Sequence, residues 1–265
     1  MRSTTAVVTG AGRGVGLEIA RQLAFAGNRV LLTDIDGDAA KRAAAEVGHE
    51  AWSAQHDVRD PSSHRDVAAQ ACAQGRLAVW VNNAGVLLAG DCWTHTDEQI
   101  TNILNTNVLG VISGSAAAVD SMGSSGGAIL NIASLSALAP VPGLALYAAT
   151  KAAVLSFTTS LQGDLDHAGL PIRARALCPD VVHTSMVTSR ADDPGAAILF
   201  AGPKLLAPED VARAALEMLE SRQIFRVVPR WRGLVARSSG ATPSLGLKTI
   251  ALMRGRGERR QRERA

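Results

Sequence analysis

Short apolar runs alternate with longer helical patterns from Ala6 to Val228, and this regular alternation is the feature that most constrains the fold. The apolar runs predict strands at residues 6–9, 29–33, 51–55, 78–81, 128–133, 172–177 and 225–228. The helical patterns between them predict helices at residues 15–26, 38–47, 62–73, 97–119, 147–166 and 208–219. Repeated β-α alternation predicts an α/β fold with one doubly wound parallel sheet flanked by helices. Such sheets bind ligands at the carboxyl ends of their strands.

Composition and charge divide the chain into a main domain and a tail. The 265 residues are 47% hydrophobic and 19% charged, which suits one soluble domain at residues 1–230 with a sizeable core. The β-α rhythm breaks at residues 184–207, which we interpret as a lid. Residues 226–265 hold 11 Lys/Arg and two Glu, so a basic C-terminal extension at 231–265 follows an acidic body. Its last stretch, RGRGERRQRERA, is polar enough to predict disorder.

A glycine-rich turn follows the first predicted strand and opens the first predicted helix, with the sequence Thr9-Gly10-Ala11-Gly12-Arg13-Gly14-Val15-Gly16. Glycines allow a tight turn and let a pyrophosphate approach the backbone, while the helix N-terminus offers free N–H groups. The pattern therefore predicts a dinucleotide site. The residues of this turn expected to form the cofactor site are Gly10, Arg13, Gly14, Val15 and Gly16.

Asp34 ends the second predicted strand, about 20 residues beyond the glycines, where the adenosine ribose of a dinucleotide would lie. A carboxylate there accepts hydrogen bonds from the ribose hydroxyls and repels a 2′-phosphate. Asp34 therefore favours NAD. Arg13 supports the opposite choice, because a cation in the glycine turn could pair with the 2′-phosphate of NADP.

Further motifs follow the later strands in a fixed order. They are Asp57-Val58, Asn82-Asn83-Ala84-Gly85, the series Asn107, Ser134, Tyr147 and Lys151, and Pro179-Asp180-Val181-Val182-His183-Thr184. Together with the glycine turn, they resemble the motifs of the short-chain dehydrogenase/reductase family over about residues 5–230. The resemblance implies a Rossmann-type fold. It also implies that adenine lies at Asp57 and Val58, and that Asn83, Gly85, Pro179, Val182 and Thr184 contact the cofactor.

The resemblance implies a catalytic tetrad of Asn107, Ser134, Tyr147 and Lys151. It also implies that hydride passes between NAD(H) and a secondary alcohol or ketone. A free tyrosine has a pKa of about 10, too high for a base near neutrality. Lys151 lies one helical turn after Tyr147, so its charge is expected to lower that pKa. Ser134 is expected to hold the substrate oxygen, and Lys151 the nicotinamide ribose. Asn107 is expected to kink its helix and hold a water beside Lys151.

The substrate end of the site is predicted to be apolar, with one departure from the family pattern. Asp180 stands where the family usually has glycine. It either accepts a hydrogen bond from a polar substrate group or turns to solvent. The segments expected to line this end are Val86-Leu87-Leu88, Leu135, Val141-Pro142-Gly143-Leu144 and the lid. Their apolar character favours a lipophilic alcohol or ketone.

Three alternatives remain open: an NADP-dependent ketone reductase, a non-catalytic NAD-binding regulator on the same fold, and a basic tail that touches a membrane surface. The tail could equally dock on another subunit or stay solvated. The family resemblance implies a homodimer or homotetramer. Because the N-terminus runs straight into the first strand, we expect no signal peptide and a cytoplasmic location. We expect no metal and no nucleic acid as partners.

Overall fold

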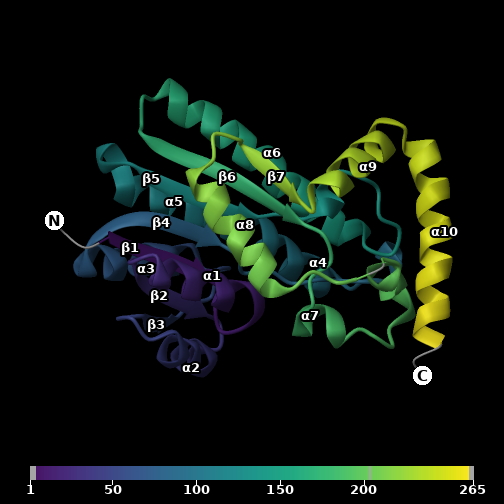
Figure 1. The fold of residues 1–265 in the computed structure, drawn as a ribbon, viewed down its shortest axis with the longest axis horizontal. Helices are drawn as coiled ribbons and strands as arrows, with labels where there is room; N and C mark the ends of the chain where they lie inside the picture. The colour runs from purple at the N-terminus through teal and green to yellow at the C-terminus, as the bar shows by residue number, and fades with distance from the viewer. Residues whose placement is uncertain (1–3, 203, 263–265) are drawn as a thin grey trace.

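The computed structural model describes residues 4–202 and 204–262, and over that part of the chain it confirms the predicted parallel sheet. Seven parallel strands lie in the order β3-β2-β1-β4-β5-β6-β7 (Figure 1). They are β1 (Thr4–Thr9), β2 (Arg29–Asp34), β3 (Trp52–Gln55), β4 (Arg76–Asn82), β5 (Gly127–Ile132), β6 (Ile172–Pro179) and β7 (Phe225–Val228). Each agrees with a predicted apolar run to within two residues at either end.

Helices connect the strands much as the sequence predicts. They are α1 (Gly14–Phe25), α2 (Gly37–Val47), α3 (Pro61–Gln74), α4 (Asp97–Leu104), α5 (Gly110–Met122), α6 (Ala145–His167), α7 (Ser185–Thr188) and α8 (Pro208–Glu220). A π-helical segment, η2 (Asn105–Leu109), separates α4 from α5. The predicted helix at 97–119 is thus three consecutive segments, and the expected irregularity at Asn107 is confirmed.

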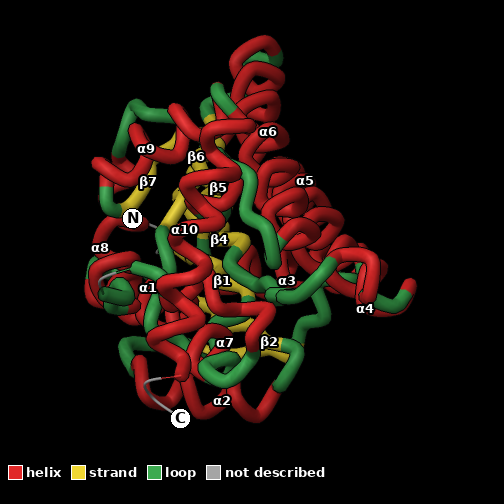
Figure 2. Tube along the Cα trace, turned by 90° about the vertical axis from the view of Figure 1, so that its right-hand side faces the viewer, coloured by secondary structure: helices red, strands yellow, loops and turns green. Residues whose placement is uncertain are grey.

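The sheet forms a central layer between two groups of helices (Figure 2). Along each strand, successive side chains point to opposite faces. Val8 packs with α1, α2 and α8, whereas its neighbour Val7 packs with α3, α5 and α6. Because both faces are covered, the central strands are mostly apolar, as is typical of buried parallel sheets.

The carboxyl ends of the strands meet at one edge of the sheet, and the C-terminal extension lies beyond that edge (Figure 1). The extension consists of α9 (Arg230–Ala241) and α10 (Pro243–Arg262). Up to Arg262 the structure differs from the expected disorder, because this part of the stretch is helical, whereas residues 263–265 lie outside the described residues. Tertiary packing explains the difference: Gly257 lies so close to Ala197 that a Cβ there would be 1.9 Å from the Ala197 carbonyl oxygen.

No helix in the described ranges combines the length and the apolar character needed to cross a membrane.

Candidate active site

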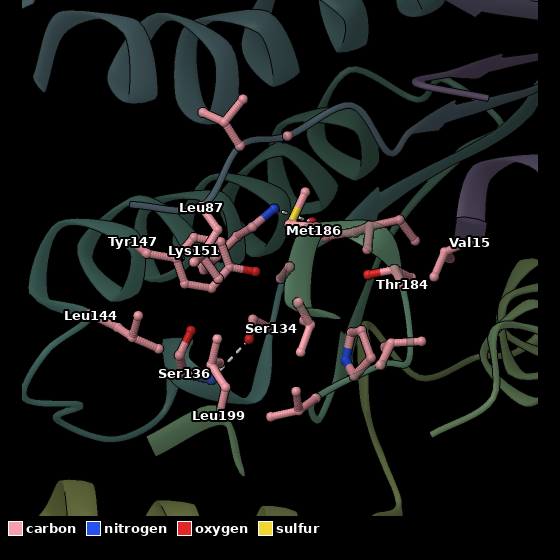
Figure 3. Close-up of a pocket in the computed structure, with 18 of the residues that line it drawn as sticks. Val15, Leu87, Ser134, Ser136, Leu144, Tyr147, Lys151, Thr184, Met186 and Leu199 are labelled. Carbon is pink, nitrogen blue, oxygen red and sulfur yellow. Dashed lines mark hydrogen bonds between the residues drawn. The ribbon is translucent and has the colours of Figure 1, made fainter. Parts of the chain in front are cut away.

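A single cavity of about 830 Å³ lies at the carboxyl ends of the strands and collects most of the residues singled out in the sequence. Its lining begins at the glycine turn and Asp34. It continues past Tyr147 and Lys151 to α7, to η5 (Pro194–Phe200), and to the C-terminal helices. Figure 3 shows Ser134, Tyr147, Lys151 and Thr184 around this one space.

The glycine turn leaves no room for side chains at two positions, so its backbone itself forms part of the cavity wall. Gly10 has φ 61°, a left-handed conformation that favours glycine, and a Cβ there would lie 2.7 Å from Ala84 Cα. A Cβ at Gly16 would lie 2.4 Å from Asn83 Nδ2. The first turn of α1 therefore comes directly against the loop after β4. Gly14 and Val15 of this turn line the cavity, and a helix N-terminus is a favourable place for an anionic group.

Asp34 is held as a hydrogen-bond acceptor at the rim of the turn. The Gly12 N–H donates to Oδ2 at 3.0 Å, and the Asp36 N–H donates to Oδ1 at 3.1 Å. Arg13 is exposed beside it and also lines the cavity. Among the residues that the structure describes, Arg13 forms no ion pair with Asp34. The carboxylate is thus oriented by backbone N–H groups rather than neutralised by a cation.

Asp57 and Val58 line the same end of the cavity, but Asp57 has a partner that sequence reasoning missed. The Arg59 guanidinium donates to both carboxylate oxygens, at 2.9 Å to Oδ1 and 2.6 Å to Oδ2. These hydrogen bonds lower the pKa of Asp57. The pairing spans only two residues, so the sequence Asp57-Val58-Arg59 was the signal that could have revealed it.

Two consecutive asparagines at the end of β4 hold neighbouring elements together. Asn82 Nδ2 donates to Asn131 Oδ1 at 2.8 Å and to Ser115 Oγ at 3.0 Å, which joins β4, β5 and α5. Asn83 Nδ2 donates to the carbonyls of Thr9 and Gly10, both at 2.9 Å. Asn83 therefore fixes the glycine turn to the loop that carries Gly85.

Asn107 lies fully buried in the π-helical segment and bonds to two backbone groups of Val86. Its Oδ1 accepts from the Val86 N–H, and its Nδ2 donates to the Val86 carbonyl, both at 2.8 Å. Nδ2 also reaches Thr150 Oγ1 at 3.1 Å. A Cβ at Gly85 would lie 3.3 Å from Asn107 Oδ1 and 3.6 Å from Lys151 Nζ, so the two polar groups flank the same glycine.

Ser134, Tyr147 and Lys151 come together at the centre of the cavity. Lys151 Nζ lies 5.7 Å from the Tyr147 ring centre and donates to the Ile132 carbonyl at 2.8 Å. Burial raises the pKa of Tyr147 to about 12, although a hydrogen bond with Ser134 opposes this rise. Burial also lowers the pKa of Lys151 to about 8.

Burial, and not the charge of Lys151, has the largest effect on the pKa of Tyr147, so the protein alone does not give the lowered pKa that was expected. Removing the phenolate from water has the larger effect in this structure, and the Lys151 ammonium is directed to a backbone carbonyl. The geometry still holds an ammonium beside the phenol. Any group that brings a further positive charge into the cavity would favour the phenolate.

The segment after β6 runs alongside the glycine turn. Pro179, Val182 and Thr184 all line the cavity, and Thr184 Cγ2 would lie 3.3 Å from a Cβ at Gly14. Asp180 lines the cavity rather than turning to solvent, and it has a partner that was not predicted. Its Oδ2 forms an ion pair with Arg232 Nε of α9 at 2.8 Å, and the side chains are only 19% and 17% exposed, respectively.

The end of the cavity that is expected to take the substrate is mostly apolar, and its wall includes residues that were not predicted. Of the expected lining residues, the cavity includes Val86, Leu87, Leu135, Val141 and Leu144, and it leaves out Leu88, Pro142 and Gly143. The C-terminal helices add Arg232, Val235, Ala236, Ser239, Ile250 and Met253. Residues 232, 235, 236 and 239 share one face of α9, because they are three or four positions apart. This spacing was the signal that could have revealed that the helix lines the cavity. The described residues contain no cluster of potential metal ligands.

Three comparisons place the chain among known proteins. The family model for short chain dehydrogenases matches residues 4–195. The 3-beta-hydroxysteroid dehydrogenase of Comamonas testosteroni is 36% identical over 191 residues, covering 71% of this chain and 74% of that protein. A short-chain dehydrogenase/reductase from Burkholderia phymatum, solved in complex with NAD, superposes with a TM-score of 0.84 at 25% identity. That match covers 92% of this chain and 95% of the other.

Another relative limits what family membership says about activity. The inactive 2-(S)-hydroxypropyl-CoM dehydrogenase 2 of Xanthobacter autotrophicus is 34% identical over 224 residues, covering 78% of this chain and 94% of that protein. Members of this family therefore include an inactive protein, and catalysis depends on the residues of each site. The matched family model and the arrangement of the seven-stranded sheet agree: the chain belongs to the short-chain dehydrogenase/reductase family of oxidoreductases.

Proposed function

We propose that the protein interconverts a secondary alcohol and a ketone with NAD(H) as the cofactor. The observation that carries the proposal is the convergence of Ser134, Tyr147 and Lys151 in one cavity with the glycine turn. The turn fits a dinucleotide, because backbone lies where a Cβ would fill the space at Gly10 and Gly16. Asp34 presents a carboxylate, held by two N–H groups, at the ribose end.

Each of the residues in the cavity has a separate role in the proposed reaction. When bound, the nicotinamide ring would supply the hydride acceptor or donor. Ser134 orients the substrate oxygen toward Tyr147, whose hydroxyl gives or takes the proton. Lys151 stabilises the phenolate form by its charge and can hold the nicotinamide ribose. The apolar side chains of Leu87, Leu144 and other cavity residues favour a lipophilic substrate.

A substrate screen tests this proposal directly. Purified protein is mixed with a panel of secondary alcohols and ketones and with each nicotinamide cofactor, and the nicotinamide absorbance is followed. We expect turnover of lipophilic members with NAD(H), and none in a Tyr147→Phe variant that still binds NAD. A protein that binds NAD but turns over no member would instead favour the regulator.

A further inference from the structure

The C-terminal helices form part of the cavity wall, and glycines bring them close to the rest of the fold. Helix α9 packs Gly233 against β7, where a Cβ would lie 3.0 Å from Val227 Cγ2. Gly240 is so close to the chain after η4 (Leu135–Ala137) that a Cβ would lie 2.4 Å from the Leu138 carbonyl oxygen. Helix α10 contacts η5 through Gly257. These close approaches fix one face of the pair of helices toward the cavity.

The attachment also contains one ion pair at the cavity itself. Asp180 lies directly after β6, and Arg232 lies in the first turn of α9. Besides the 2.8 Å contact at Nε, an Arg232 Nη2 donates to Asp180 Oδ1 at 3.3 Å. Both side chains line the cavity and are more than four-fifths buried. Charge-assisted contacts in such surroundings are stronger than exposed ones.

We propose that Asp180 is a positioning residue that, through Arg232, holds α9 and α10 as the wall that determines substrate size. This inference rests on the proposed function. Val235 and Ala236 follow Arg232 on the cavity face of α9, and Ile250 and Met253 of α10 lie further along the wall. A bulky lipophilic substrate reaches these side chains, whereas a small alcohol contacts only the residues around Ser134 and Tyr147.

The proposal explains why the carboxylate occurs at this position. With glycine at residue 180, Arg232 would be left without its carboxylate in a largely buried position, which is costly. The aspartate and the arginine are therefore interdependent. The aspartate also fixes the first turn of α9. The positions of Val235 and Ala236, which follow on the cavity face of this helix, depend on that turn.

Steady-state kinetics with two substrates test the proposal. The probes are the largest and smallest alcohols turned over in the panel, and the variants are Asp180→Gly, Arg232→Met and the double substitution. We expect each single variant to raise KM for the large alcohol at least tenfold and KM for the small alcohol less than twofold. NAD affinity should stay within twofold of the wild type. The double variant should raise KM for the large alcohol no more than the single variant with the larger effect. Arg232→Lys should recover part of the loss.

The matched control is Arg230→Met, which removes an exposed arginine of the same helix that does not line the cavity. It should leave both KM values unchanged. Equal increases in both KM values, or additive effects in the double variant, would overturn the proposal.

Hydrogen–deuterium exchange provides a readout that needs no substrate. In Asp180→Gly, amides of α9 should exchange at least tenfold faster, while those of β1 and β4 stay unchanged. Unchanged exchange in α9 would refute the positioning role. If the wild type turns over no alcohol, the proposed function fails, and exchange alone decides whether Asp180 holds these helices.

Discussion

Tyr147 is the residue at which the proposed chemistry can be tested most sharply. Tyr147→Phe removes the hydroxyl and keeps the ring that packs beside Leu87 and Leu144. Loss of a positioned proton donor costs about 10²–10⁴-fold, so kcat should fall by that amount with NAD affinity within twofold. Lys151→Ala should reduce both kcat and NAD affinity. Near wild-type kcat in Tyr147→Phe would refute the assigned role.

Cofactor choice is decided at Asp34. Its carboxylate is held in place by Gly12 and Asp36, so it cannot easily turn away from a 2′-phosphate. One unit-charge pair at about 4 Å costs roughly 4 kcal/mol at an effective dielectric near 20, before relaxation. We therefore predict that kcat/KM favours NAD over NADP by at least about tenfold, which corresponds to roughly 1.4 kcal/mol.

Two variants distinguish the effect of Asp34 on cofactor preference from that of Arg13. Asp34→Ala should shrink the preference for NAD, because the repulsion is lost and the exposed Arg13 can then reach the phosphate. Adding Arg13→Ala to Asp34→Ala should reduce efficiency with NADP and leave that with NAD nearly unchanged. Both cofactors are measured with one substrate. A wild type that uses NADP equally well would show that Arg13 governs the pocket.

At the scale of elements, a pair of buried histidines connects the residue that follows β3 to α3. The rings of His56 and His64 lie edge to face, with their centres 4.5 Å apart. His56 Nδ1 lies 3.0 Å from Thr33 Oγ1, within hydrogen-bond distance. Burial lowers the pKa of His56 to about 3, and it also lowers the pKa of His64. The unfolded chain therefore binds protons near pH 6.5 that the folded protein excludes.

This difference predicts acid sensitivity of the fold. Stability is fully present above about pH 6.5 and falls as pH drops toward the folded pKa of His56, at up to about 1.4 kcal/mol per pH unit. From pH 7 to 5, His56 alone should reduce the free energy of unfolding by about 2 kcal/mol. Urea unfolding at both pH values measures this. His56→Gln should weaken the pH dependence, whereas His167→Gln, at an exposed position, should not.

Sequence reasoning located the elements better than the contacts between them. Strand and helix patterns are local, so β7 was predicted with its observed ends, and the motif residues came from fixed spacings. The pairing of Asp180 with Arg232 joins residues 52 apart, and no local pattern encodes it. The helices of the C-terminal extension were missed for the same reason, because Gly233 and Gly257 weaken helix propensity but permit tertiary contact.

At the scale of the whole molecule, the basic surface of α10 is the feature that could bring the protein to an anionic membrane. Lys248, Leu252, Arg256 and Arg259 are exposed on this helix. Each basic residue near such a surface contributes about 1 kcal/mol. We therefore expect salt-dependent sedimentation with anionic vesicles, weakened about 30-fold in Lys248→Gln/Arg256→Gln. Lys41→Gln/Arg42→Gln on α2 is the control, and equal binding by both variants would exclude α10.

Self-association should involve the surface around η2, between α4 and α5. Leu109, in the π-helical segment that holds Asn107, is 52% exposed, and Ile112 of α5 is 36% exposed. Such apolar patches typify subunit interfaces. We expect a homodimer or homotetramer that Leu109→Asp/Ile112→Asp converts to the 27.6 kDa monomer in light scattering after size exclusion. Phe25→Asp, at an apolar side chain 86% exposed on α1, should leave the mass unchanged. Because Asn107 lies between these helices, separation should also lower kcat, and an unchanged mass for the double variant would place the interface elsewhere.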